Sequence, residues 1–225
     1  MNLGSLAEQR ASYRSTGWCA SAQAIPESVA GPARALAREL AQRRPRQDLL
    51  SGMHNPFGHH ACPNEAWRFL DLAESPALLD LVESVLGPDL VLWDSELYPD
   101  LSAWPRDEAQ QWPVDPLAGT VVCIDFERRR TVLIDITRLA EVFDAIAFPP
   151  GPCYTVRYMP ASSRYNRDPR FAPNRLATQL RPLVNHAIRP VWLVRGEDRA
   201  GNDFVSGFAL PAARWADAVR LPPEQ

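Results

Sequence analysis

Hydrophobic residues recur at helical spacing in the first part of the chain. The segment Gly31–Arg44 predicts a helix, with Pro32 in its first turn and Pro45 as its stop. A shorter helix is expected to follow a cap at Asn64. The segment Ser75–Gly87 predicts the clearest helix, because its leucines and valines fall along one side. These helices are expected to form one layer that packs on a flat surface.

Short runs rich in β-branched and aromatic residues follow, and such runs are typical of strands. One further helix is expected from Thr137, and the proline-bearing stretches Pro99–Pro116 and Pro160–Pro182 are expected to be long loops with functional roles. Helices followed mainly by strands favour an α+β fold with a largely antiparallel sheet or sandwich. The predicted strands are Leu90–Trp93, Thr120–Phe126, Thr131–Ile136, Tyr154–Met159, Ile188–Val194 and Phe204–Leu210.

Length and composition limit the number of domains, the partners and the cellular location that can be expected. A chain of 225 residues predicts one domain, with a mainly helical part over 1–88, a β-sandwich core over 89–210 and a C-terminal tail over 211–225. A net charge of −3 gives no support for nucleic-acid binding, and no apolar run is long enough to span a membrane. The polar N-terminus without a signal peptide predicts a cytoplasmic protein. All 24 basic residues are arginine, so no site can depend on a lysine.

Two segments hold residues that could bind a metal. Three of the four histidines lie within His54–His60, followed by Cys62, and this loop either joins a metal site or is a polar loop with local hydrogen bonds. His186 stands near Arg189 and Arg195, and a histidine beside an arginine could bind a metal and an anionic carboxylate. The commoner alternative is a structural histidine beside a solvated arginine.

The order of several motifs resembles the phytanoyl-CoA dioxygenase-like family of iron/2-oxoglutarate oxygenases. A helix runs into Gly87-Pro88-Asp89 and a first strand, and Trp104 and Trp112-Pro113 flank the place of the family's His-x-Asp iron motif. Further on, Met159–Arg164 is similar to the family's Pro-Gly-Ser-His segment. The resemblance implies a distorted double-stranded β-helix (a cupin-like jelly roll), with N-terminal helices packed on the sheet.

The same register implies that the iron motif is replaced. Arg106 falls at the position of the iron-binding histidine and Glu108 at that of the aspartate. A glutamate can ligate iron, whereas a guanidinium stays protonated and offers no lone pair. The resemblance leaves His186 as the candidate for the distal histidine and Arg195 as the residue for the 2-oxoglutarate carboxylate. Arg106 is expected either to pair with Glu108 or to bind an anionic ligand in the same pocket.

Three functions stay open from the sequence. The first is a degenerate relative of these oxygenases, a pseudoenzyme that keeps a small-molecule pocket around Trp104, Arg106, Glu108 and Trp112 but lacks the iron site. The second is an active dioxygenase that uses Fe(II) and 2-oxoglutarate, with Glu108 and His186 as unusual metal ligands. The third is a non-enzymatic binding or scaffold protein in which the two tryptophans form an exposed contact patch.

Overall fold

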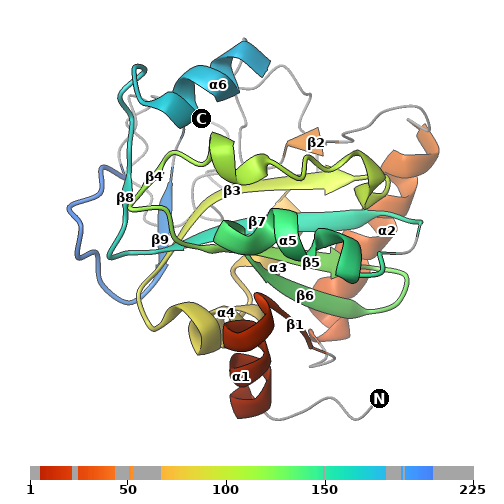
Figure 1. Cartoon of the computed structure of the whole chain (residues 1–225). Coiled ribbons are helices and arrows are strands. Elements are labelled where there is room, and N and C mark those ends of the chain that lie inside the picture. The colour runs from red at the N-terminus through yellow and green to blue at the C-terminus, as the bar shows by residue number, and fades with distance from the viewer. Residues whose placement is uncertain are drawn as a thin grey trace, which may run out of the picture.

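The computed structural model describes residues 6–21, 25–43, 51–52, 67–148, 150–180, 189 and 191–204. An antiparallel sheet forms its centre, in the order β1-β6-β5-β7-β3-β2, with β9 also paired to β3 (Figure 1). A second sheet of two strands pairs β4 with β8. The strands are β1 Trp18–Ser21, β2 Ser51–Gly52, β3 Leu90–Tyr98, β4 Val114–Asp115, β5 Thr120–Asp125, β6 Arg130–Asp135, β7 Cys153–Pro160, β8 Arg164–Tyr165 and β9 Trp192–Arg195.

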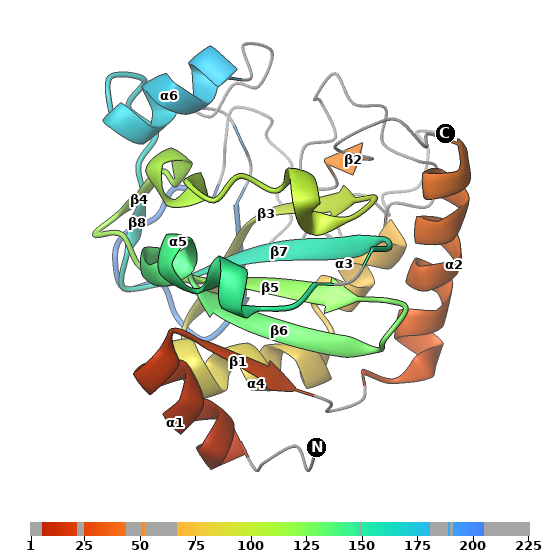
Figure 2. The same ribbon diagram turned by 45° about the vertical axis from the view of Figure 1, so that its right-hand side comes forward.

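Helices cover one face of the main sheet, and short turns cover the other (Figure 2). The helices are α1 Leu6–Thr16, α2 Glu27–Arg43, α3 Trp67–Ala73, α4 Pro76–Leu86, α5 Leu139–Val142 and α6 Ala172–Leu180. The 3-10 turns are η1 Leu101–Ala103, η2 Glu108–Gln111, η3 Ile136–Arg138 and η4 Phe143–Ala145. None of the described helices is long and apolar enough to cross a membrane.

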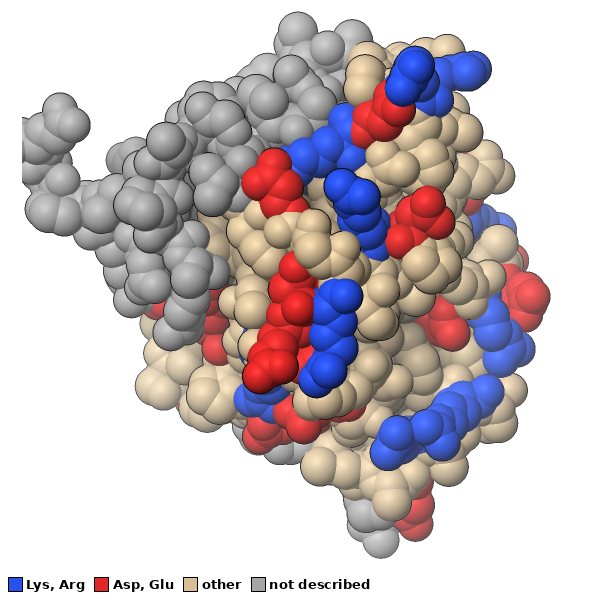
Figure 3. Space-filling model, turned by 90° about the vertical axis from the view of Figure 1, so that its left-hand side faces the viewer, with Lys and Arg blue, Asp and Glu red and all other residues tan. Residues whose placement is uncertain are grey.

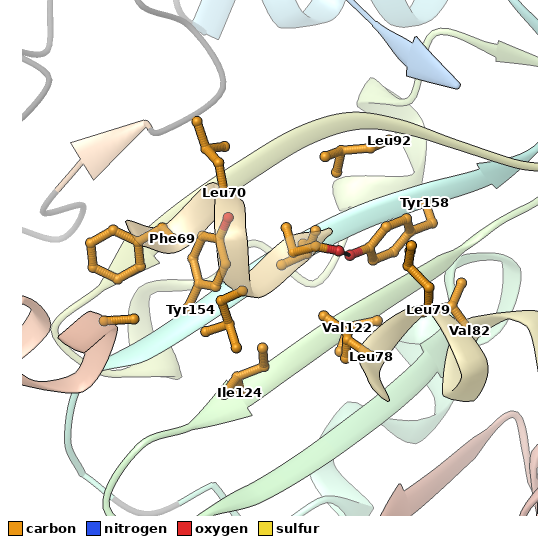
Figure 4. Packing of buried hydrophobic residues seen from close by; sticks show 14 of the residues in the cluster. Phe69, Leu70, Leu78, Leu79, Val82, Leu92, Val122, Ile124, Tyr154 and Tyr158 are labelled. Carbon is orange, nitrogen blue, oxygen red and sulfur yellow. Dashed lines mark hydrogen bonds between the residues drawn. The ribbon is translucent and has the colours of Figure 1, made fainter. Parts of the chain in front are cut away.

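Alternation along the central strand β7 produces two separate hydrophobic clusters. Tyr154, Val156 and Tyr158 point to the side of α1–α4, where they pack with leucines of α3 and α4 (Figure 4). The Tyr158 hydroxyl donates a 2.5 Å hydrogen bond to the Ala73 carbonyl and so fixes the end of α3 to the sheet. Met159 belongs to the other cluster, which contains residues of η1, β4, α5 and β8. The face of the sheet opposite the large helices is called the interior face below.

This architecture confirms the α+β class and the distorted double-stranded β-helix with helices packed on its sheet. The small β4–β8 sheet contributes Val114 and Tyr165 to the interior cluster, so it forms the second layer of the jelly roll. Five of the six predicted strands are present with shifted ends. The sixth, Phe204–Leu210, lies outside the described residues except for Phe204, which is not in a strand.

Several expectations about helices need correction. Helix α2 starts at Glu27, four residues before the predicted start, so Pro32 lies inside the helix. The helix expected from Thr137 is instead a succession of short turns, η3, α5 and η4. The supposed loop Pro160–Pro182 contains helix α6, and α1 and β1 were not predicted. The expected cap Asn64 lies outside the described residues.

Acidic and basic side chains are interleaved on the face that Figure 3 shows, and no field of one sign forms there. Exposed ion pairs join Arg170 to Asp168 at 2.8 Å and Arg138 to Glu141 at 3.1 Å. Pairs of this kind contribute little to stability, about 0–1 kcal/mol each.

Candidate functional site

A cluster of charged residues lies buried on the interior face of the main sheet. The members of this interior ion cluster are Asp94, Glu96, Glu108, Arg157 and Arg189, and none is more than 5% exposed. Charged side chains are almost never buried to this degree unless they are paired. The cluster stands where two layers of a jelly roll enclose their interior, which makes it the candidate functional site.

An irregularity in β3 brings two of these side chains to the interior face. Leu92 pairs with Tyr158 and Asp94 pairs with Arg157, so Trp93 is an extra residue between two paired positions. Such a bulge shifts the alternation of side chains by one position. Trp93 therefore joins the interior hydrophobic cluster, and the next residue, Asp94, reaches Arg157 and Arg189 on the same side.

The Glu108 carboxylate is surrounded by N–H donors. It accepts hydrogen bonds from the indole Nε1 of Trp104 and from that of Trp112, the second at 3.0 Å. Arg157 adds two more, from Nε at 2.6 Å and from Nη2 at 2.8 Å. The short turn η2 makes this possible, because it places the tryptophans four residues before and four residues after the glutamate. Four donors occupy both oxygens of this carboxylate.

Arg157 links the acidic members of the cluster. Its Nη2 donates to Glu96 Oε2 at 2.6 Å, which also accepts from the Tyr98 hydroxyl at 2.7 Å, and its Nη1 lies 3.8 Å from Asp94 Oδ2. Arg189 Nη1 lies 2.6 Å from the same Asp94 oxygen. Burial tends to lower the pKa of Arg157, but the three carboxylates outweigh this and hold its pKa well above the ordinary value. Arg157 is therefore a permanent cation in the interior.

The cluster has one negative charge in excess, since three carboxylates face two guanidinium groups. Beside it is a cavity of about 20 Å³, lined by Trp93, Arg189 and Ala177 of α6 among others. The Trp93 Nε1 and Arg189 Nε groups are buried and have no hydrogen-bond partner within the part of the chain that the structure describes. A cavity needs about 10–15 Å³ and two to four polar partners to hold one water. The space suits a single water molecule.

The structure separates the residues that the sequence proposed for the pocket. Trp104, Glu108 and Trp112 come together, but Arg106 lies outside, with 61% of its side chain exposed. Its guanidinium pairs with Asp144 at 2.9 Å and stacks over Phe143, so the expected pairing of Arg106 with Glu108 does not occur. The exposed tryptophan patch is also wrong, because Trp104 and Trp112 are only 2% and 1% exposed.

The remaining predicted residues lie elsewhere. Arg195, the residue suggested for the 2-oxoglutarate carboxylate, stands on β9 and binds two acidic side chains of α4, Asp80 at 2.8 Å and Glu83 at 2.5 Å. It is therefore engaged on the helix-covered side of the sheet rather than at the ion cluster. His186, the His54–His60 loop and Cys62 are outside the described residues.

The described residues do not fit an iron site. They contain no group of three His, Cys, Asp or Glu side chains that could hold a metal ion. The nearest approach to one is the three carboxylates of the cluster, and Arg157 lies among them. A guanidinium in this place supplies charge compensation but no lone pair for a metal.

Sequence reasoning missed four members of the cluster or gave them no role in it: Asp94, Glu96, Arg157 and Arg189. A usable signal exists for three of them. Asp94 and Glu96 interrupt the apolar run of β3, and Arg157 interrupts that of β7. A charge inside a strand that is apolar on both sides needs a buried partner of opposite sign. Which partner it finds cannot be read from the spacing.

Comparison with solved structures supports the architecture. CytC3 with Fe(II) and alpha-ketoglutarate is similar with a TM-score of 0.53 and 14% identity, over 91% of this chain and 94% of that one. The Ni complex of ThoJ, described as a non-heme monooxygenase, is similar with a TM-score of 0.50 and 17% identity, over 93% and 89% of the two chains. No protein-family model matches the sequence, and no curated protein matches it significantly. The protein thus has the fold of non-heme oxygenases, and identities this low show the fold alone.

Proposed function

We propose that this protein is a non-catalytic relative of the iron/2-oxoglutarate oxygenases, of the phytanoyl-CoA dioxygenase-like kind that its motifs resemble. It keeps the jelly roll and lacks the iron chemistry. One observation carries the proposal: the Glu108 carboxylate, the expected metal ligand of the motif loop, accepts four N–H hydrogen bonds. A carboxylate in this environment has no free lone pair directed at a metal.

The energetic argument supports the same conclusion. To bind iron, Glu108 would have to leave Arg157 and two indoles, and the buried guanidinium would lose its closest partner. Breaking a buried ion pair costs about 3–5 kcal/mol because a charge is left uncompensated.

2-Oxoglutarate meets a similar obstacle in the interior. The two buried guanidinium groups, Arg157 and Arg189, already pair with carboxylates of the protein. The excess negative charge of the cluster repels a dianion, and the cavity of about 20 Å³ has no room for it. In the proposed function the ion cluster therefore fills the part of the interior where iron and 2-oxoglutarate would bind. A small-molecule ligand has to bind elsewhere on the protein.

The test begins with metal content, measured by mass spectrometry on protein purified without chelator or immobilised metal. Anaerobic titration with Fe(II) and 2-oxoglutarate follows, and we expect neither stoichiometric iron nor a charge-transfer absorption band. The titration is repeated on Glu108→Gln and His186→Ala. Iron bound by the wild type and lost in both variants would instead establish an active oxygenase with Glu108 and His186 as ligands.

A further inference from the structure

A second cavity lies far from the interior face, between the start of α2 and the β5–β6 hairpin. Its volume is about 270 Å³. Ile25, Ile124 and Phe126 supply apolar walls, and Ala30 stands on the α2 side. The hairpin end lies beside α2 in Figure 2. We call this space the hairpin pocket. Its size is just below the range of about 300–1,000 Å³ that is usual for small-molecule sites.

The hairpin that borders the pocket has a fixed shape. Asp125 ends β5, and its Oδ1 accepts hydrogen bonds from the backbone N–H groups of Glu127 and Arg128, both at 3.0 Å. Arg129 follows with φ of 52°, a left-handed conformation that few residues other than glycine and asparagine adopt. The turn therefore presents a large cationic side chain at a position that favours a small residue, and that side chain lines the pocket.

The charged side chains at the rim of the pocket differ in how closely each is paired with a side chain of opposite charge. Glu27 is bound by Arg34 through both carboxylate oxygens, and this hydrogen bonding lowers the pKa of Glu27 and keeps it ionised. Arg129 reaches the same carboxylate only at 3.9 Å, and 71% of its side chain is exposed. The neighbouring Glu127 forms an ion pair with Arg38 at 2.7 Å. Among the described residues, the carboxylate partner of Arg129 is therefore a distant one that another arginine already neutralises.

We propose that the hairpin pocket binds a small amphipathic carboxylate, with its apolar part against Ile124 and Phe126 and its carboxylate on the Arg129 guanidinium. A guanidinium binds a carboxylate through two parallel N–H groups, which gives direction as well as charge. An ammonium head group meets no accessible acceptor of this kind among the described residues. Arg34 holds both oxygens of Glu27, Asp125 Oδ1 accepts from the hairpin backbone, and Asp125 Oδ2 is buried below the surface. The pocket therefore selects an anion at its rim.

The volume limits the length of this ligand. A pocket of about 270 Å³, just below the usual range, suits a ligand at the small end of those that such sites hold. An unbranched acid of about eight carbons has this size, and octanoate is a suitable probe. A ligand this small and flexible binds with a dissociation constant on the order of 1 mM. This inference does not depend on the absence of iron, because the two sites lie on opposite faces of the sheet.

Isothermal titration with three eight-carbon probes tests the proposal: octanoate, octan-1-ol and octylamine. We expect octanoate to bind roughly tenfold more tightly than octanol, since one charge-assisted contact changes affinity by about this factor. Octylamine should bind most weakly. Saturation-transfer NMR on the same samples then shows which protons of the probe contact the protein.

Two substitutions at the pocket and one matched control give the decisive comparison. Arg129→Ala should lower octanoate affinity about tenfold and leave octanol unchanged. Arg128→Ala, the adjacent exposed arginine of the same turn, should change neither. Ala30→Phe should abolish both by filling the pocket, with circular dichroism to verify its folding.

Several results would overturn the proposal. These are the failure of all three probes to bind, equal affinity for the acid, the alcohol and the amine, or equal effects of the Arg128 and Arg129 substitutions. The two arginine variants change only an exposed turn, so the headgroup comparison decides the matter even if Ala30→Phe does not fold. Iron binding at the interior would contradict the proposed function while leaving the result at the hairpin pocket intact.

Discussion

Replacing Arg157 with methionine removes the cation that holds the interior ion cluster together. The variant loses three hydrogen bonds to carboxylates, two to Glu108 at 2.6 and 2.8 Å and one to Glu96 at 2.6 Å, and a longer one to the Thr155 hydroxyl at 3.4 Å. Each bond to a charged group contributes about 1.5–3 kcal/mol, but bonds of one guanidinium are not additive. Breaking a buried pair typically costs about 3–5 kcal/mol, and we expect about 4 kcal/mol here.

Urea denaturation followed by tryptophan fluorescence measures this loss as a difference in the free energy of unfolding between wild type and variant. The double variant Arg157→Met/Glu108→Gln completes a thermodynamic cycle, and we expect a coupling energy of about 2 kcal/mol between the two positions. A cost below about 1 kcal/mol would refute this account, because it would mean that the cluster is solvated.

Three further predictions follow from other parts of the structure. Burial raises the pKa of Cys19 to about 11 and that of Tyr165 to about 12. Because the unfolded chain loses these protons at lower pH than the folded protein, the free energy of unfolding should fall above about pH 9. The fall should be smaller in Cys19→Ser. A free energy of unfolding that stays constant up to about pH 11 would contradict the burial of these groups. Gly119→Ala places a methyl group 2.3 Å from Trp112 at a φ of 153°, and should lower stability by at least about 2 kcal/mol in thermal melting. Arg106→Ala removes an exposed ion pair and the exposed stacking over Phe143, and should lower stability by no more than about 2 kcal/mol by the same measurement.

The sequence was sufficient for the class of fold, because hydrophobic periodicity is a local property. The strand Thr120–Phe126 and the helix after Ser75 were predicted close to their observed positions. Helix α6 was not predicted, because part of what holds it is an anchor to the preceding loop: the Asn174 side chain donates to the backbone carbonyls of Asn166 and Asp168 at 2.8 and 2.9 Å. A proline-bearing polar segment gives little sign of such an anchor.

The candidate site was predictable only in part. The two tryptophans and Glu108 are close in sequence, so a single short turn brings them together. Arg157 is 49 residues from Glu108 and 61 residues from Glu96, and no spacing rule reports a pair so distant. The bulge at Trp93 could not be predicted from the sequence either, although it decides on which side of the sheet the Asp94 side chain lies. Pairing across distant strands is a property of the whole fold.

The way the cluster is built also constrains how this sequence can change. Its five charges come from β3, η2, β7 and the segment before β9, and each one compensates another. Replacing either arginine alone leaves buried carboxylates without a counterpart, so substitutions of Arg157 or Arg189 are tolerated in combination with a carboxylate rather than one at a time. A mutational route from this interior to one that binds a metal would pass through unstable intermediates. The residues of the ion cluster are therefore difficult to change one by one. Redesign of this fold towards metal binding would have to replace several of these residues in one step.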